Sequence, residues 1–294
     1  MPPSSLTIGL IQQINDEDQT SNWRSSERGI RQAAAQGAKL IVLPELHNSL
    51  YFCQTENPDY FQLAETLPGP TTEHFGKIAK ELSVTVVTSI FQRRAVGVYH
   101  NTAVVIDSQG QIAGSYQKMH IPDDPGFYEK YYFAPGDQGF TPIHSNDLCL
   151  GVQVCWDQWF PEGARLMTLA GADLLIYPTA IGWDKKENCD QLRQKELNAW
   201  IAIQQSHAIA NGIPVICCNR SGLETTEGGN GIQFWGNSFV VAADGEIIAR
   251  SPTEDADVLV CTLDLEQTSK QRHTWPFLRD RRIDQYQGLN QRYL

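Results

Sequence analysis

Short apolar runs alternate with amphipathic stretches along most of the 294-residue chain. Brief runs rich in β-branched residues predict buried strands, and longer segments with helical spacing of apolar positions predict helices. Strands are expected at 6–11, 40–43, 84–91, 99–106, 112–117, 148–154, 172–177, 214–218, 239–242, 246–251 and 258–263. Helices are expected at 22–36, 71–82, 160–170 and 191–211. Because crossover connections are mixed with hairpins, this order predicts a layered α/β domain with mixed rather than purely parallel sheets.

Turn-forming residues separate these elements. Asp107-Ser108-Gln109-Gly110 and Ala243-Asp244-Gly245 each lie between two predicted strands and are typical of hairpins. Gly228-Gly229-Asn230-Gly231 lacks the lysine and the strand–helix context of a phosphate-binding loop, so it is interpreted as a turn. No linker, repeat or low-complexity tract divides the sequence, and we expect one domain over residues 1–294. Residues 272–294 are polar and aromatic, which is typical either of a frayed end or of a tail that packs on a partner.

Composition narrows the class of protein. With 41% hydrophobic and 10% aromatic residues, the chain can build a substantial core. The net charge of −11 disfavours nucleic acid and anionic membranes as partners and mildly favours a cationic small molecule. The seven cysteines are scattered, which points to a reducing compartment, and no stretch approaches the roughly 18 apolar residues of a membrane span. We therefore expect a soluble cytoplasmic protein, and the absence of a ligand cluster predicts no metal and no cofactor.

Cys155 is the first candidate for chemistry. It follows the apolar run 148–154 and precedes the predicted helix 160–170, so it lies at a strand-to-helix corner. Backbone N–H groups and a helix N-terminus near such a corner would stabilise a thiolate and favour a nucleophile. The alternative is that Cys155 is a small buried hydrophobic residue, as most cysteines are.

Two charged residues end predicted strands and would serve as partners of a thiol nucleophile. None of the seven histidines has a recognisable Cys–His context. Glu45 closes the segment that begins at Leu40, where burial would raise its pKa toward that of a general base, unless it simply meets solvent. Lys118 follows the strand at 112–117 and would stabilise an oxyanion, unless it is an ordinary solvated lysine.

Together these segments resemble a known family. Leu43-Pro44-Glu45, Tyr116-x-Lys118-x-His120 and Val154-Cys155-Trp156-Asp157 are similar to the three catalytic boxes of the nitrilase superfamily of carbon–nitrogen hydrolases, in the family's order and at its approximate spacing. The resemblance implies a four-layer αββα sandwich. It also implies a catalytic triad of Glu45, Lys118 and Cys155. A non-enzymatic binding module on the same fold would predict a decayed triad, yet all three residues are present.

The same resemblance carries two further expectations. Glu129 corresponds to a second glutamate that supports the triad lysine and the substrate in relatives. Members of the superfamily usually form homodimers or larger homo-oligomers, so residues 272–294 are expected to be a C-terminal tail used in contacts between copies.

Longer matches narrow the expected substrate. Residues 120–130, 155–162 and 177–182 are similar to segments found in N-carbamoylputrescine amidases. The implied reaction is hydrolysis of N-carbamoylputrescine to putrescine, carbon dioxide and ammonia by a thiol mechanism, within polyamine biosynthesis from agmatine. The alternative is a β-ureidopropionase-like or ω-amidase-like hydrolase of another small ureido or amide substrate. The anionic substrates of those enzymes call for arginine or lysine far from the thiol, whereas the candidate positions here are acidic.

A pocket for such a cation needs apolar walls and a carboxylate at its far end. In plant-type amidases a glutamate two residues past the glycine that matches Gly182 meets the substrate amine. Here that position holds the shorter Asp184, and Trp183 replaces a small residue, so Asp184 is expected either to bind the amine or to be a solvated loop acid. Asp124, with Asp123, would add negative charge at the mouth. Aromatic walls, or else core packing, are expected from Tyr51, Phe52, Trp156 and Trp183.

Overall fold

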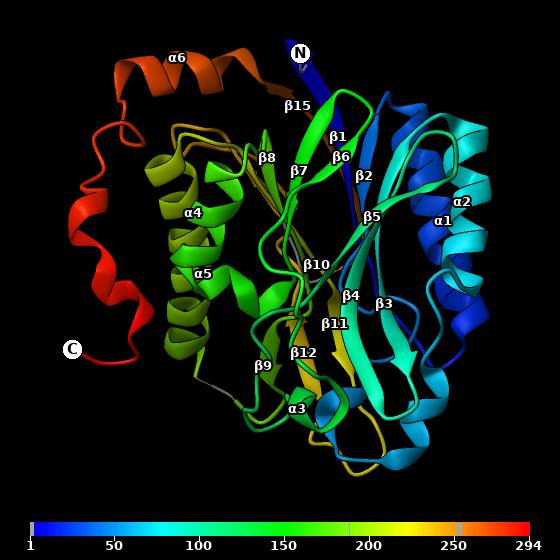
Figure 1. Cartoon of the computed structure of the whole chain (residues 1–294). Helices are drawn as coiled ribbons and strands as arrows, with labels where there is room; N and C mark the ends of the chain where they lie inside the picture. The colour runs from blue at the N-terminus through cyan, green and yellow to red at the C-terminus, as the bar shows by residue number, and fades with distance from the viewer. Residues whose placement is uncertain (1–2, 188, 252–254) are drawn as a thin grey trace.

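Two six-stranded sheets lie face to face in the computed structural model, which describes residues 3–187, 189–251 and 255–294 (Figure 1). The first sheet has the order β15 (Asp257–Asp264), β1 (Ser5–Gln12), β2 (Leu40–Val42), β3 (Thr85–Ala95), β4 (Val98–Ile106) and β5 (Ile112–Gln117). The second has the order β14 (Ile247–Arg250), β13 (Phe239–Val241), β10 (Val215–Asn219), β8 (Leu174–Thr179), β7 (Leu148–Val152) and β6 (Ile143–Ser145). In each sheet three neighbouring strands are parallel and the flanking ones antiparallel, which confirms the predicted mixed sheets.

Helices cover both outer faces. On the first sheet lie α1 (Gln19–Ala35) and α2 (Pro70–Leu82), and on the second lie α4 (Pro161–Leu169) and α5 (Asp190–Asn211), as Figure 1 shows. This arrangement is the four-layer αββα sandwich that the family resemblance implies. Within the described ranges, no helix is both long and apolar enough to cross a membrane.

The alternation of side chains along β2 shows how the first sheet packs against a layer on each of its faces. In β2, Leu40 and Val42 join the core between the two sheets, where they share a cluster with Ile176 of β8. Ile41 points the other way and packs with Phe75 of α2. Because successive side chains on a strand point to opposite faces, a wholly apolar strand needs cover on both sides. The unbroken apolar character of Leu40 to Leu43 therefore encodes a strand inside the sandwich.

The remaining elements are short and were less visible in the sequence. A three-stranded sheet is formed by β11 (Ser221–Glu224), β12 (Ile232–Trp235) and β9 (Gly182–Asp184), in that order. Residues Gly228 to Gly231 lie in the connection from β11 to β12, as the turn interpretation predicted. The short helices are η1 (Phe52–Gln54), η2 (Pro58–Leu63), α3 (Glu129–Tyr132), η3 (Cys155–Trp159), η4 (Ile283–Gln285) and η5 (Gln287–Asn290).

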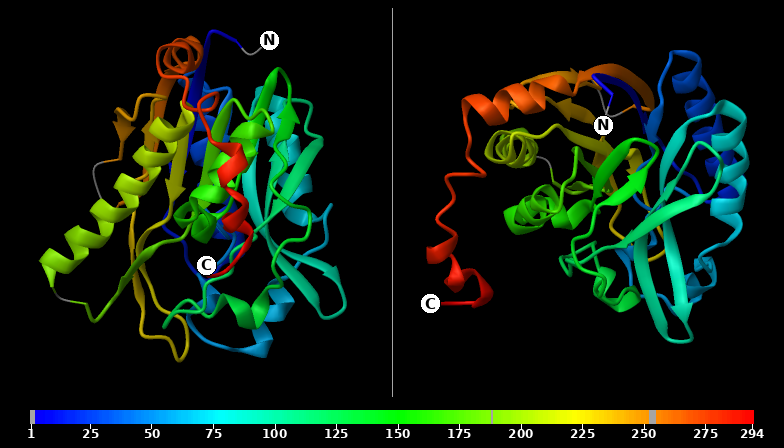
Figure 2. Two further views of the ribbon diagram at one scale, coloured as in Figure 1. Left: turned by 60° about the vertical axis from the view of Figure 1, so that its left-hand side comes forward. Right: turned by 45° about the horizontal axis from the view of Figure 1, so that its top comes forward.

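The C-terminal segment begins inside a helix. The helix α6 spans Glu266–Thr274, so the expected tail boundary at residue 272 falls in its last turn. Beyond it the chain runs along the α4 side of the molecule and stands away from the sheets (Figure 2). Trp275 is 53% exposed and Leu289 66% exposed, so this segment presents apolar side chains to the outside.

Candidate active site

Cys155 lies where β7 gives way to η3. Its φ is 42°, in the left-handed region that non-glycine residues rarely adopt. Such a conformation costs on the order of 1–3 kcal/mol and persists only where the surroundings impose it. The sharp turn leaves the thiol 5% exposed, with its Sγ 3.8 Å from the carbonyl oxygen of Ala180.

Asp157 holds this turn in place. Its fully buried carboxylate accepts hydrogen bonds from the backbone N–H of Val154 (3.1 Å) and the hydroxyl of Tyr116 (3.0 Å). It also accepts from the backbone N–H of His120 (2.9 Å) and lies 2.7 Å from Nδ1 of that side chain. Asp157 therefore ties the segment that carries Lys118 to the turn that carries Cys155. This role of Asp157 was not among the sequence predictions, although its place two residues after the cysteine was a usable signal.

Lys118 lies between two buried carboxylates. Its Nζ donates to Glu45 Oε1 at 2.8 Å and to both oxygens of Glu129, at 2.7 and 2.9 Å. All three side chains are at most 1% exposed. The hydroxyl of Tyr51 donates to Glu129 Oε1 at 2.7 Å, and the side-chain amide of Asn101 donates to Glu45 Oε1 at 2.6 Å. The structure thus brings together Glu45, Lys118 and Glu129, which sequence separates by as many as 84 positions.

Burial and charge set the protonation of this group. Burial alone would lower the pKa of Lys118, but Glu129 and Glu45 outweigh it and raise that pKa well above its usual value. Burial raises the pKa of Glu129 from 4.5 to about 6, against the opposing effect of Lys118. Lys118 therefore stays a cation, with one carboxylate more than it needs for charge balance.

The thiol environment differs from the sequence expectation. Burial, followed by the negative charge of Glu45, raises the pKa of Cys155 well above its usual value, although Lys118 opposes this. The helix α4 begins at Pro161, one residue after the predicted start, and η3 lies between it and the β7 strand that precedes Cys155. The resting thiol is therefore neutral and needs a base. Glu45 Oε2 is buried and has no hydrogen-bond partner among the described residues, so it is free to accept a proton.

A buried ion pair supports the loop after Glu45. Arg220 and Glu224 are at most 1% exposed, and Nη1 of Arg220 donates to both carboxylate oxygens of Glu224 at 2.8 Å. The guanidinium also donates to the carbonyl oxygens of Glu45 (3.1 Å) and of Leu46, whose φ is 48°. The backbone N–H of Tyr51 donates to Glu224 at 2.6 Å. This pair was not predicted from the sequence, where its signal was two opposite charges beside an apolar strand.

A cavity of about 320 Å³ opens above Cys155. Its floor includes buried Cys155 and Glu129, and its mouth includes exposed Asp124 and Pro125. The lining residues are Pro122, Asp124, Pro125, Phe127, Glu129, Cys155, Trp156, Trp159, Ala180, Ile181, Gly182, Glu196, Ala199 and Trp235. Among these described residues there are three acids and no Lys, Arg or His. The cavity is therefore apolar with an acidic bias.

The predicted substrate-binding residues divide into two groups. Trp156 and Asp124 line the cavity, and Tyr51 lies behind it as the hydrogen-bond donor to Glu129. Trp183 and Asp184 are not among the lining residues. They belong to β9, which pairs with β12 and of which only Gly182 is among the described lining residues.

The side chains of β9 have other contacts. Trp183 is buried beneath the guanidinium of Arg193, whose Cζ lies 5.2 Å from the ring centroid. Asp184 is exposed and accepts a hydrogen bond from the backbone N–H of Lys186 at 2.8 Å, so it forms a local turn. Glu196 of α5 lines the cavity instead, and it was not among the residues predicted from the sequence.

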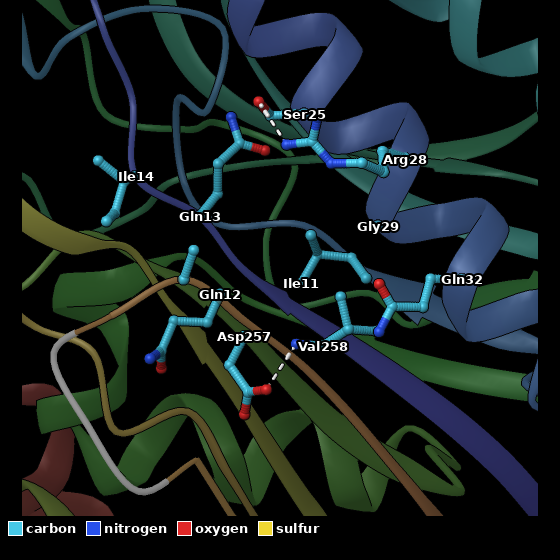
Figure 3. Close-up of a pocket in the computed structure, with 11 residues that line it drawn as sticks. Ile11, Gln12, Gln13, Ile14, Ser25, Arg28, Gly29, Gln32, Asp257 and Val258 are labelled. Carbon is cyan, nitrogen blue, oxygen red and sulfur yellow. Dashed lines mark hydrogen bonds between the residues drawn. The ribbon is translucent and has the colours of Figure 1, made fainter.

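A second cavity lies between α1 and the edge formed by β1 and β15 (Figure 3). It measures about 380 Å³, and its lining includes Gln13, Arg28, Gln32 and Asp257. The carboxylate of Asp257 already accepts from the backbone N–H of Val258 at 2.8 Å. No cysteine is among its described lining residues, so this cavity has no nucleophile comparable to Cys155. Across the part of the chain that the structure describes, no group of three or more His, Cys, Asp or Glu side chains could hold a metal ion.

Comparison with known proteins agrees with this geometry. A family model described as carbon–nitrogen hydrolase matches residues 7–273. The N-carbamoylputrescine amidase of Oryza sativa subsp. japonica is 41% identical over 97% of this chain and 95% of its own length. A citrullinase of Francisella tularensis is 36% identical over 99% of this chain and 100% of its own length. The crystal structure of a carbon–nitrogen hydrolase from Helicobacter pylori G27 has a TM-score of 0.95 and 45% identity, and the match covers 99% of this chain and 100% of that one.

Proposed function

The chain belongs to the carbon–nitrogen hydrolase family, and on that premise we propose that it hydrolyses N-carbamoylputrescine to putrescine, carbon dioxide and ammonia. The observation that carries this proposal is the apolar, acidic cavity above Cys155. N-carbamoylputrescine joins a ureido group to an ammonium through four methylenes. Its methylenes suit apolar walls, and its ammonium suits a site with carboxylates, because a cation removed from water must be paired.

In the proposed first half-reaction, Cys155 attacks the carbamoyl carbon. The thiol proton moves to Glu45 Oε2, the oxygen without a hydrogen-bond partner among the described residues, as the carbon–sulfur bond forms. Lys118 and a backbone N–H near Trp156 then stabilise the negative oxygen. Glu45 returns the proton to the departing nitrogen, which leaves as a neutral amine, and a thiocarbamate remains on the cysteine.

In the second half-reaction, Glu45 takes a proton from water and the resulting hydroxide attacks the thiocarbamate carbonyl. The carbon–sulfur bond breaks, the proton returns to sulfur, and the carbamate released decomposes to carbon dioxide and the second nitrogen product. Glu129 keeps Lys118 charged and in position throughout, with hydrogen bonds of 2.7 and 2.9 Å. General acid–base catalysis of this kind contributes roughly 10²–10⁴-fold and an oxyanion donor about 10²–10³-fold.

The alternatives differ from N-carbamoylputrescine in charge. Citrulline, the substrate named by the relative from Francisella tularensis, carries a carboxylate beside its ammonium, and N-carbamoyl-β-alanine carries only a carboxylate. The described lining offers no cationic side chain to pair with either carboxylate, and its acids would repel it. The charge of the cavity therefore favours the purely cationic substrate.

Ammonia release by the purified protein tests the proposal. N-carbamoylputrescine, citrulline, N-carbamoyl-β-alanine and an ω-amide such as α-ketoglutaramate are compared by kcat/KM at equal ionic strength. We expect N-carbamoylputrescine to exceed each of the others by at least tenfold. A higher kcat/KM for N-carbamoyl-β-alanine or the ω-amide would establish the alternative activity instead.

We also propose that residues 272–294 contribute to contacts between copies of the chain. The exposure of Trp275 and Leu289 supports this, since isolated copies would leave these side chains in water. Light scattering of the full chain and of a variant that ends at Thr274 tests it. A smaller assembly for the shortened chain is expected, and an unchanged mass would refute the tail's role.

A further inference from the structure

We infer that Glu196 binds the distal ammonium of the substrate and thereby sets the preference for cationic ureas, an inference that rests on the proposed function. Asp184, the position suggested by plant-type relatives, does not have this role.

Glu196 lies on the one face of α5 that reaches the cavity. Ala199, three residues later, is the other lining residue that α5 contributes, and positions three apart share a helix face. Leu197 and Trp200 of the same helix are buried and belong to the core between the sheets and the helices. Packing of that buried face fixes the rotation of α5, so Glu196 is held toward the cavity by the core.

The exposure of the lining residues indicates that Glu196 lies nearer the mouth of the cavity than Cys155 does. Cys155 and Glu129 are buried, whereas Glu196 is half-buried and Asp124 and Ala199 are exposed. A substrate with its carbamoyl carbon at Cys155 therefore extends its other end toward these outer residues. The ammonium of N-carbamoylputrescine lies at that other end.

The carboxylate of Glu196 makes no hydrogen bond or ion pair within residues 3–187, 189–251 and 255–294. Neighbouring acids are occupied differently: Glu187 accepts from the backbone N–H of Cys189 at 2.7 Å, and Asp184 from that of Lys186. Burial and the nearby charge of Glu187 raise the pKa of Glu196 above its ordinary value, in keeping with a carboxylate that lacks a counter-charge. A cation would supply that charge.

The walls of the same cavity suit an aliphatic spacer. Trp156, Trp159, Ile181 and Trp235 line it and present mostly carbon. The proposed substrate would place its tetramethylene chain against these side chains. Asp124 adds negative charge at the mouth without competing for the role, because its exposure leaves it screened by water.

Steady-state kinetics of Glu196→Gln with two substrates tests the inference. N-carbamoylputrescine is compared with N-pentylurea, in which a methyl group replaces the ammonium. We expect the variant to raise KM for N-carbamoylputrescine about tenfold, with kcat within twofold, because an interaction shared by ground and transition states affects KM alone. KM for N-pentylurea should change less than twofold. Asp184→Asn provides the competing test, and Asp190→Asn provides a matched control from an exposed acid on the same helix that does not line the cavity.

Charge reversal gives a second readout that a structural role would not produce. Glu196→Lys should raise kcat/KM for 4-ureidobutyrate, the anionic counterpart of N-carbamoylputrescine, while lowering it for the cation. The role of Glu196 would be refuted if Glu196→Gln lost kcat/KM equally on N-carbamoylputrescine and N-pentylurea, or if only Asp184→Asn raised KM. Either result would leave the proposed function intact. If the wild-type protein does not prefer N-carbamoylputrescine to N-pentylurea, the proposed function fails and this inference fails with it.

Discussion

Replacing Glu224 by glutamine should destabilise the fold and displace the proposed catalytic base together. The carboxylate of Glu224 accepts two 2.8 Å hydrogen bonds from Arg220 and one of 2.6 Å from the backbone N–H of Tyr51. Glutamine keeps the shape and one acceptor but leaves the guanidinium of Arg220 buried without a counter-charge. Breaking a buried pair in this way costs about 3–5 kcal/mol, and the retained acceptor places our expectation near 3 kcal/mol. That is a large part of a typical free energy of unfolding of roughly 5–15 kcal/mol.

The same change should lower activity through geometry. Arg220 also holds the carbonyl oxygens of Glu45 and Leu46, so a shifted guanidinium moves the loop that begins at Glu45. A displacement of about 1 Å can reduce turnover as much as 10²-fold, so we expect kcat to fall at least tenfold while KM changes little.

Urea unfolding followed by tryptophan fluorescence measures the first effect, and steady-state kinetics under native conditions measures the second. Glu246→Gln is the matched control, because it makes the same chemical change on an exposed acid in the β13–β14 turn. The control should match the wild-type protein in both measurements. A loss below about 1 kcal/mol in Glu224→Gln, with wild-type kcat, would refute the reasoning that this ion pair supports the catalytic loop.

Four further predictions concern the site itself. Cys155→Ala should abolish ammonia release from N-carbamoylputrescine, whereas Cys189→Ala, which removes an exposed thiol, should retain it; turnover by Cys155→Ala would exclude thiol catalysis. Because the pKa of Glu129 is raised to about 6, its carboxylate gains a proton as pH falls through that value, so kcat/KM should decline below about pH 6; a profile flat to pH 5 would contradict this. The raised pKa also sets how folding stability depends on pH. The contribution of Glu129 to stability is complete below about pH 4.5 and is lost as pH rises through about 6. Urea unfolding at several pH values, compared between the wild-type protein and Glu129→Gln, would detect this loss. Asp157→Asn should cost about 1–3 kcal/mol of stability and lower kcat, because an amide cannot accept from all the donors that Asp157 satisfies; an unchanged urea midpoint would argue against that support.

The periodicity of the sequence determined most of the sandwich because buried strands and amphipathic helices leave clear patterns. The predicted strand at 112–117 coincides with β5, and the predicted helix at 191–211 begins one residue after the start of α5. The small sheet of β9, β11 and β12 was missed because its strands are only three or four residues long, and β9 and β11 also contain glycine and charged residues. Strands of that length are defined by tertiary pairing, which no local pattern records.

The catalytic residues of the site could be predicted from the sequence, whereas the thiol pKa and the role of Glu196 could not, for a related physical reason. Glu45, Lys118 and Cys155 end or follow strands, so the sheets alone bring them to one edge. The raised pKa of Cys155 could not be predicted, because it depends on how completely the folded chain buries the thiol and on the charge of Glu45 beside it. Glu196 was missed for another reason: a charged residue on a helix reveals its role only when the rotation of that helix against the core is known.

The two ends of the cavity are therefore supported in different ways. At the reacting end, Glu45 and Glu129 are buried and both accept hydrogen bonds from buried Lys118, so a change in any one of the three disturbs the other two. At the far end, Glu196 is half-buried, has no partner among the described residues and lies on a helix that is anchored by other side chains. Substitution there alters the charge of the cavity without disturbing the core. Such a division would allow one fold to keep its carbon–nitrogen chemistry while single substitutions at the mouth change which small molecule reaches the thiol.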